Sequence, residues 1–230
     1  MRKISCEVCT VRGEGAICNL PPSILREFQA IGVSSLYRPR QVVFSAGNPS
    51  TGLYLVCQGA VKLFHSDRFG REHILEVAGP RAVLGEFSLD AARTHSVSAE
   101  ALTHCQLTYL PTRRLADFLR RHPETALHML EALSHELALA RRKVRDLALK
   151  RADSRLAALL LHLLEPGTEK IRLEYTRREI AEMVGVSTET AIRLLGRLRR
   201  AGTLEVRGRE VVVRDLGRLA RLAHYDETDA

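Results

Sequence analysis

The sequence has no apolar run long enough to cross a membrane. Its most apolar stretch, 156–164, spans nine residues and includes His162, whereas a membrane helix needs about 18 or more. The N-terminus has no apolar core of the signal-peptide type. The patterns G-x-x-x-x-G-K, G-x-S-x-G and H-E-x-x-H are missing, and the nine histidines define no obvious dyad. We therefore expect a cytoplasmic protein with no membrane contact and no enzymatic activity.

Length and composition are those of a globular chain. Its 230 residues lie between one large domain and two modest ones, at about 150 residues per domain. Apolar residues make up 45 % and charged residues 27 %, which argues against a disordered or fibrous chain. The 35 Lys and Arg residues outnumber the 27 Asp and Glu residues. The resulting net charge of +8 favours nucleic acid or another polyanion as a partner.

The five cysteines are an odd number, which argues against a disulfide scaffold in a chain without a secretion signal. Metal binding, redox sensing and plain burial remain as roles. Cys6, Cys9 and Cys18 form the pattern C-x2-C-x8-C within a glycine-containing stretch of little apolar periodicity. We treat 1–20 as a separate cysteine-bearing segment.

Short β-type runs dominate the next part of the chain, 21–122. Pro21 and Pro22 are expected to begin a short helix with one apolar face. From Tyr37 onward, runs at 41–44, 53–56, 60–64, 73–77 and 106–110 alternate with turn glycines. This texture predicts a small antiparallel roll, sandwich or barrel.

A long helix is predicted over 124–150, within a dimerisation and hinge segment that we assign to 123–152. Its apolar residues recur at alternating spacings of three and four: Leu130, Leu133, Leu137, Ala140, Val144 and Leu147. This seam either packs onto the roll or pairs with a second copy in a symmetric dimer. The charged stretch 150–154 is the expected hinge, with Asp153 as the cap of a helix ending near 165–167.

The remaining chain, 153–230, has the pattern of a winged helix-turn-helix. Thr176 and Glu179 have capping-box spacing, and the helix that they begin is expected to stop at Gly185. Ser187 is the predicted cap of the next helix. Ala181, Val186 and Ile192 are expected to pack in the corner between the two helices. The segment 204–213 alternates around a basic tip, which predicts a hairpin, and a short helix begins at Asp215.

The second helix of this unit carries a candidate DNA-reading face. Glu189 and Arg193 are four residues apart and share that face with Ile192, while Leu194, Leu195 and Leu198 point to the core. Glutamate accepts from cytosine and arginine donates twice to guanine, and we group Thr188 with these readers. The expected phosphate contacts are Ser187, Arg197, Arg199, Arg200, Arg207 and Arg209. The alternative is an ordinary surface salt bridge between Glu189 and Arg193.

The order of segments resembles that of the Crp/Fnr transcription regulators, over about 20–223. The most specific stretch is 175–202, which reads Y-T-R-R-E-I-A-E-M-V-G-V-S-T-E-T-A-I-R-L-L-G-R-L-R-R-A-G. The family's E-x-x-x-R reader appears in it as Glu189 and Arg193. The resemblance implies an α+β fold consisting of a cyclic-nucleotide-binding-type β-roll, a long dimerisation helix and a winged helix. It also implies a homodimer on a palindromic site with TGA-like half-sites, and RNA polymerase as a partner. Ile192 departs from the serine or glycine of the family, and we expect it to contact a thymine methyl.

The resemblance also suggests an effector pocket in the roll. Members that bind cyclic AMP pair a Gly-Glu with an Arg-Ser about a dozen residues later. Gly85 and Glu86 match the first pair, but an ungapped count places His95 and Ser96 at the second, with Arg93 two residues too early. A neutral imidazole replaces a permanent bidentate cation poorly. A two-residue shift would bring Arg93 and Thr94 into place, so a cyclic nucleotide is the secondary expectation. Glu86 is otherwise a surface carboxylate beside a retained turn.

The N-terminal cysteines resemble those of Fnr-like oxygen sensors, which hold a 4Fe-4S cluster through three N-terminal cysteines and one in the roll. Cys6, Cys9 and Cys18 would be the first three ligands. The position of the fourth in Fnr-like members falls on Thr108, so we take Cys105 as the first candidate and Cys57 as the second, with a carboxylate or histidine also open. The same three thiols alternatively hold zinc, serve as a thiol switch, or have no such role.

Overall fold

The computed structural model describes residues 17–70, 72–90, 92–164, 168, 170–172, 175–207 and 210–224. It consists of two compact units, Met1–Ala138 and Leu139–Ala230. Cys6, Cys9, Arg209 and the predicted helix end at 165–167 lie outside the described residues, as does the side chain of Arg207. None of the described helices is long and apolar enough to span a bilayer.

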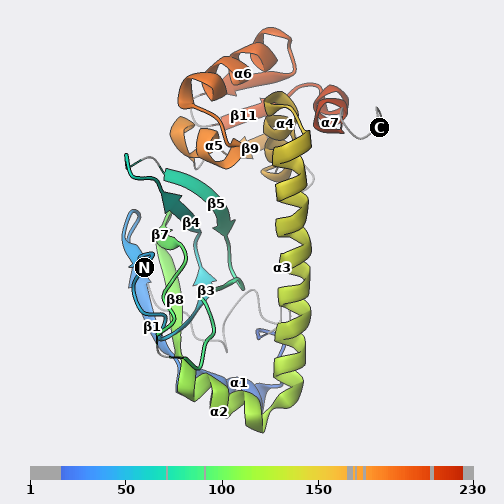
Figure 1. Cartoon of the computed structure of the whole chain (residues 1–230). Coiled ribbons are helices and arrows are strands. Elements are labelled where there is room, and N and C mark those ends of the chain that lie inside the picture. The colour runs from blue at the N-terminus through green and yellow to red at the C-terminus, as the bar shows by residue number, and fades with distance from the viewer. Residues whose placement is uncertain are drawn as a thin grey trace. The chain divides into compact units, whose positions relative to one another are not determined.

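The first unit is built on two four-stranded antiparallel sheets (Figure 1), in the orders β1-β8-β3-β6 and β2-β7-β4-β5. Its elements are α1 (Pro22–Ile31), β1 (Val33–Tyr37), β2 (Val42–Phe44), β3 (Gly52–Gln58), β4 (Val61–Ser66), β5 (Glu72–Ala78), β6 (Val83–Leu84), β7 (Ser98–Ala101), β8 (Cys105–Pro111), α2 (Thr112–Arg121) and the first part of α3 (Pro123–Leu149). The predicted antiparallel roll is confirmed. The strands β1, β6 and β7 were not predicted.

Strand β3 separates two apolar clusters in this unit. The inter-sheet cluster fills the space between the sheets and includes Val56, Val61 and Leu107. The helix-side cluster includes Leu53 and Leu55 of β3, and its other members are Ile17, Leu20, Leu25, Phe28, Leu110, Leu115 and Phe118. Because side chains alternate along a strand, Leu53 and Leu55 face one cluster and Val56 faces the other.

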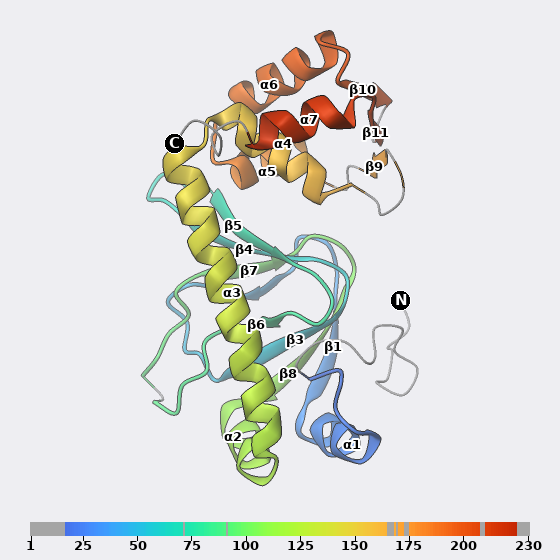
Figure 2. The ribbon, with the colours of Figure 1, turned by 90° about the vertical axis from the view of Figure 1, so that its right-hand side faces the viewer.

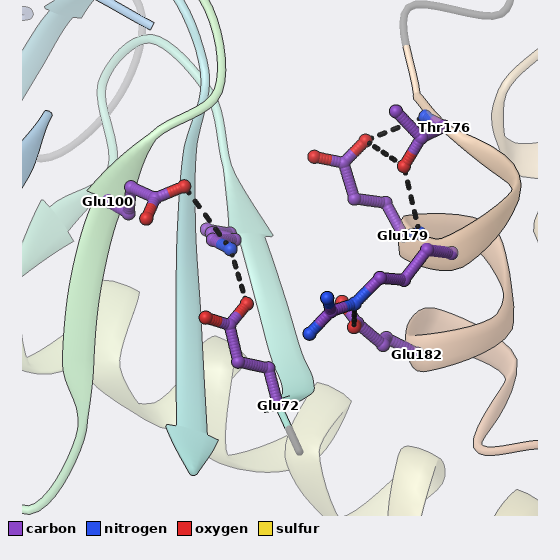
Figure 3. Close-up of polar contacts among 7 residues, drawn as sticks. Glu72, Glu100, Thr176, Glu179 and Glu182 are labelled. Carbon is purple, nitrogen blue, oxygen red and sulfur yellow. Dashed lines mark hydrogen bonds and ion pairs between the residues drawn. The ribbon is translucent and has the colours of Figure 1, made fainter. Parts of the chain in front are cut away.

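One buried cation lies on the β2-β7-β4-β5 sheet. The ammonium of Lys62 is 2.7 Å from a carboxylate oxygen of Glu72 and 3.2 Å from one of Glu100, and Figure 3 shows the two carboxylates on either side of it. Burial alone would lower the pKa of Lys62, but the hydrogen bonds and charges of Glu72 and Glu100 outweigh burial and raise that pKa. The ammonium therefore stays protonated and is paired with both carboxylates within the sheet.

The second unit contains the end of α3 and a small helical core over a three-stranded sheet of order β10-β11-β9 (Figure 2). Its further elements are α4 (Ala152–His162), β9 (Lys170–Arg172), α5 (Arg177–Val184), α6 (Thr188–Arg200), β10 (Leu204–Arg207), β11 (Glu210–Val213) and α7 (Leu216–His224). Leu156, Leu160, Ile180 and Leu219 are fully buried in its core. The predicted helix-turn-helix and hairpin are confirmed, and β9 is an addition.

The helix ends explain why this unit folds as it does. The predicted capping box is present, because the Thr176 hydroxyl accepts from the Glu179 N–H and the Glu179 carboxylate accepts from the Thr176 N–H (Figure 3). Gly185 ends α5 with φ at 73°, in the left-handed region that favours glycine. The prediction of Asp153 as a cap is wrong, because α4 begins at Ala152 after Arg151 and the Asp153 carboxylate accepts from the Ser154 N–H.

Candidate nucleic-acid interface and sensor sites

The orientation of α6 is fixed at its start and along its buried face. Ser187 is the N-cap, and its hydroxyl accepts from the Thr190 N–H at 3.2 Å. Leu194, Leu195 and Leu198 are buried in the core of the second unit, as predicted. The opposite face of α6 is consequently held toward solvent by packing and capping together.

The exposed face of α6 brings Glu189, Ile192 and Arg193 together in one stripe. Ile192 is 52 % exposed, so its predicted packing role in the helix corner is wrong, and its position matches the predicted reading face instead. Hydrogen bonds from its own backbone N–H and from Ser187 lower the pKa of Glu189, which keeps the carboxylate ionised. The stripe thus offers an acceptor, an apolar contact and a bidentate donor.

The described residues among the predicted phosphate contacts have different surroundings. Arg197, Arg199 and Arg200 are all exposed in the last turn of α6. The Arg197 guanidinium also lies 4.0 Å from the Asp153 carboxylate. Ser187 is exposed, but its hydroxyl already caps the helix. Thr188, predicted to read bases, is half-buried in the first turn.

Gly196 is a residue of this face that sequence reasoning missed. It lies three positions beyond Arg193, and a Cβ built on it meets nothing within 4 Å. Glycine inside a helix costs about 1 kcal/mol relative to alanine. No packing contact within the described chain requires a glycine at this position. The sequence feature that could have identified Gly196 is a glycine in the middle of an amphipathic helix.

The predicted dimer seam is solvent-exposed along α3. Its five large side chains are 40–67 % exposed: Leu130, Leu133, Leu137, Val144 and Leu147. Ala140 is exposed as well. In the first unit, Leu130, Leu133 and Leu137 are therefore left uncovered by the roll. Of the helix's residues, only Thr125 is fully buried in this structure.

The loop after β6 gathers three of the residues predicted for an effector pocket. The Glu86 carboxylate accepts from the Ser96 N–H at 2.9 Å and from the Ser96 hydroxyl at 2.5 Å, and lies 3.0 Å from Nδ1 of His95. Burial would raise the pKa of Glu86, but these hydrogen bonds outweigh it and lower that pKa. His95 is 5 % exposed and stacks on Phe44 with ring centroids 4.0 Å apart.

The other two predicted pocket residues have different surroundings. Gly85 adopts φ of 99°, which explains the retained glycine of this turn. The Arg93 side chain is exposed, and its carbonyl oxygen accepts from the Ser50 N–H. The structure thus places an acidic side chain, rather than an arginine, against the Ser96 donors.

The three described cysteines differ in burial: Cys105 is buried, whereas Cys18 and Cys57 are half-buried. Cys105 is fully buried in the inter-sheet cluster, with its Sγ 3.1 Å from the Ala60 carbonyl oxygen. Cys57 packs against the helix-side cluster, which also contains Ile17 and Leu20 from the stretch of chain around Cys18. Across the part of the chain that is described, no three His, Cys, Asp or Glu side chains converge as metal ligands.

Family comparisons match both units. The model of the cyclic nucleotide-binding domain matches residues 35–122, and that of the Crp-like helix-turn-helix domain matches residues 154–222. The chain is 31 % identical to a cyclic AMP receptor protein of Thermus thermophilus, over 82 % of this chain and 87 % of the relative. It is 28 % identical to an anaerobic regulatory protein of Pasteurella multocida, over 82 % and 71 % of the two chains.

Among solved structures, the chain is similar to the c-di-GMP-responsive global regulator CLP of Xanthomonas campestris. The TM-score is 0.75 at 28 % identity, covering 84 % of this chain and 99 % of the regulator. These relatives are regulators of transcription and not enzymes, in agreement with the sequence prediction. A cyclic-nucleotide-binding-type roll and a Crp-like helix-turn-helix in one chain, at this identity and coverage, show that the chain belongs to the Crp/Fnr family of transcription regulators.

Proposed function

We propose that this regulator acts as a homodimer that reads a palindromic DNA site through α6. The observation that carries the proposal is the exposed stripe of Glu189, Ile192 and Arg193 on a helix whose other face is buried. An ionised glutamate accepts from the cytosine amino group, and an arginine donates to both guanine acceptors in the major groove. A symmetric dimer presents this stripe twice, which matches two inverted half-sites.

The second copy is proposed to bind along the seam of α3. Five large apolar side chains at heptad spacing are exposed there, and such a face is stable in water when a second helix covers it. A symmetric pairing places each seam residue opposite the same surface of the partner. RNA polymerase is the further partner expected of a family member.

The signal is proposed to act through the N-terminal cysteines Cys6, Cys9 and Cys18, which would hold a 4Fe-4S cluster and report oxygen, nitric oxide or redox state. The similarity to an anaerobic regulatory protein and the C-x2-C-x8-C pattern support this proposal. When bound, the cluster supplies a centre that oxidants alter. Zinc or a thiol switch on the same cysteines are the related alternatives.

A cyclic nucleotide in the roll is the second candidate signal, favoured by the similarity to a cyclic AMP receptor protein. The contacts of Glu86 argue against it. The two Ser96 donors that an incoming phosphate would need are already bonded to the Glu86 carboxylate, and His95 stands where a permanent cation is needed. Calorimetry with cyclic AMP discriminates, because micromolar binding would favour the roll as the sensor.

The DNA-reading role is tested by selecting binding sites from a random DNA pool and measuring affinities for the selected and scrambled sites. Arg193→Ala should lower the discrimination between them by about 1–3 kcal/mol. Arg221→Ala, an exposed arginine on α7, is the matched control and should leave it unchanged. Equal discrimination by Arg193→Ala and the parent would refute the assignment.

A further inference from the structure

Arg155, near the start of α4, joins the ends of two other helices. Its guanidinium donates to the carbonyl oxygen of Lys150 at 2.7 Å and to that of Val184 at 2.9 Å, and makes a longer bond of 3.4 Å to that of Gly185. Lys150 directly follows the last residue of α3. Val184 and Gly185 end α5, at the turn of the helix-turn-helix. One half-buried side chain therefore contacts both the end of α3 and the turn that leads into α6.

The chemistry of these contacts suits an arginine. The last carbonyl groups of a helix have no donor within the helix, and they carry the negative end of its dipole. Nε, Nη1 and Nη2 of Arg155 each contact a different carbonyl oxygen. A lysine at this position would carry the same charge on a single nitrogen, without the planar fork of donors. The bridge between the two helix ends consequently depends on the guanidinium shape and not on charge alone.

The contact with Lys150 spans the junction between α3 and α4. These helices are joined by two residues, Lys150 and Arg151. The Lys150 ammonium pairs back with Asp146 of α3 at 3.4 Å. The Arg151 guanidinium pairs forward with Asp153 of α4 at 3.5 Å. Each of these ion pairs stays on its own side of the junction, whereas the bond from Arg155 reaches from α4 back to the end of α3.

The rest of the second unit makes this junction the point that decides where α6 lies. Leu156 and Leu160 of α4 share one buried core with the helix-turn-helix, so α4 and α6 form one packed body. The seam residues Val144 and Leu147 lie in the same unit, on the other side of the junction. When two copies pair along the seam, the angle between α3 and α4 therefore determines how far apart their two α6 helices lie.

We propose that Arg155 is a positioning residue that sets the distance between the two copies of α6, and with it the half-site spacing that the regulator prefers. This inference rests on the proposed homodimer and on α6 as the reading helix. Each base pair added between half-sites moves one of them by about 3.4 Å along the DNA and about 35° around it. A dimer with a fixed junction tolerates few spacings, whereas a loosened junction tolerates several.

The test measures the affinity of the full chain for duplexes that keep the selected half-sites but have spacers one or two base pairs longer or shorter. The parent should bind the selected spacing at least about tenfold more tightly than the altered ones. Arg155→Lys should reduce this preference to about threefold or less, because one nitrogen replaces three. Discrimination between selected and scrambled half-sites at the selected spacing should stay parental, because the reading face of α6 is unchanged.

These ratios separate positioning from stability. A variant that is merely less stable has less active protein, which lowers the apparent affinity for every duplex by the same factor. Arg221→Lys, the same change at an exposed arginine of α7, is the matched control and should keep the parental spacing preference. Arg155→Met removes all three hydrogen bonds and keeps a long apolar stem, so it should show no more spacing preference than Arg155→Lys. Thermal unfolding checks that each variant is folded.

The outcomes distinguish this inference from the function on which it rests. A folded Arg155→Lys protein with the parental spacing preference would overturn the role of Arg155 and leave sequence reading by α6 intact. A parent that selects half-site sequences but binds all spacings equally would do the same. A parent that selects no sequence at all would refute the proposed function, and the role of Arg155 with it.

Discussion

The Glu86 carboxylate is bonded to both the backbone N–H and the hydroxyl of Ser96, at 2.9 Å and 2.5 Å. Two donors of one residue thus converge on one carboxylate oxygen, and the His95 ring contacts the other. The Glu86 carboxylate therefore occupies the Ser96 donors that a bound anion would otherwise use. This arrangement is compatible with the lowered pKa of Glu86 and with the exposed position of Arg93.

The lowered pKa of Glu86 predicts a stability difference that depends on pH. Because the folded pKa lies below the ordinary 4.5, the ionised group stabilises the fold above that value, and the contribution is lost as the pH falls through the folded pKa. The parent should therefore unfold at higher urea concentration than Glu86→Gln at pH 7, and this advantage should shrink below about pH 4.5. An advantage that is constant from pH 7 to pH 3 would contradict the prediction.

Gly196 predicts opposite effects on stability and on DNA binding. Gly196→Ala should stabilise α6 by up to about 1 kcal/mol, because the added Cβ meets nothing in the chain. If the sugar-phosphate backbone approaches this position closely, affinity for the selected DNA site should fall about tenfold, or about 1.4 kcal/mol. Gly217→Ala on α7 is the control and should leave DNA affinity unchanged. A more stable variant with parental affinity would exclude close approach at Gly196.

The seam predicts the oligomeric state. A charge at Leu133, which is 59 % exposed here, would be buried twice in a symmetric dimer, and an unpaired buried charge costs several kcal/mol. Leu133→Asp should therefore weaken self-association by at least about 100-fold without unfolding the chain. Sedimentation velocity gives the distribution of species, and Ser134→Asp, one residue off the seam, is the control. If the Leu133→Asp protein is still a dimer, the dimer interface does not lie along the α3 seam.

Truncation of Lys62 should destabilise the fold strongly, and removal of the charges of Lys62, Glu72 and Glu100 together should restore most of the stability. Lys62→Ala leaves Glu72 and Glu100 facing each other in the sheet, and should lower the free energy of unfolding by about 3 kcal/mol. Lys62→Met combined with Glu72→Gln and Glu100→Gln removes all three charges and should recover most of this loss. Chemical denaturation measures both, and an equally unstable triple variant would show that packing of the lysine stem, rather than charge, is responsible.

The sequence predicted α5, α6 and their caps well because their determinants are local. Thr176 with Glu179, Gly185 and Ser187 act within one helical turn, and apolar spacing identified the buried leucines. Strand β7, with the sequence SAEA, has no apolar alternation and exists because β2 and β4 pair with it on both sides. Such non-local pairing leaves no local signal.

The same limit applies to the candidate sites. Spacing alone did not show that Cys57 and Cys105 face different clusters, because this depends on which face of the β1-β8-β3-β6 sheet each side chain occupies. Nor did it show that the Glu86 carboxylate turns back onto Ser96. Ile192 was assigned both to the helix corner and to the reading face, and only its exposure separates the two roles.

Strand β3 also has a mechanical consequence. Its Leu53 and Leu55 belong to one cluster and its Val56 to the other, so a single backbone forms the shared wall of two close-packed interiors. A sideways shift that closes a gap on one side opens a void on the other. Ile17 and Leu20 therefore pack against a strand, β3, whose position is fixed on its opposite face by the inter-sheet cluster.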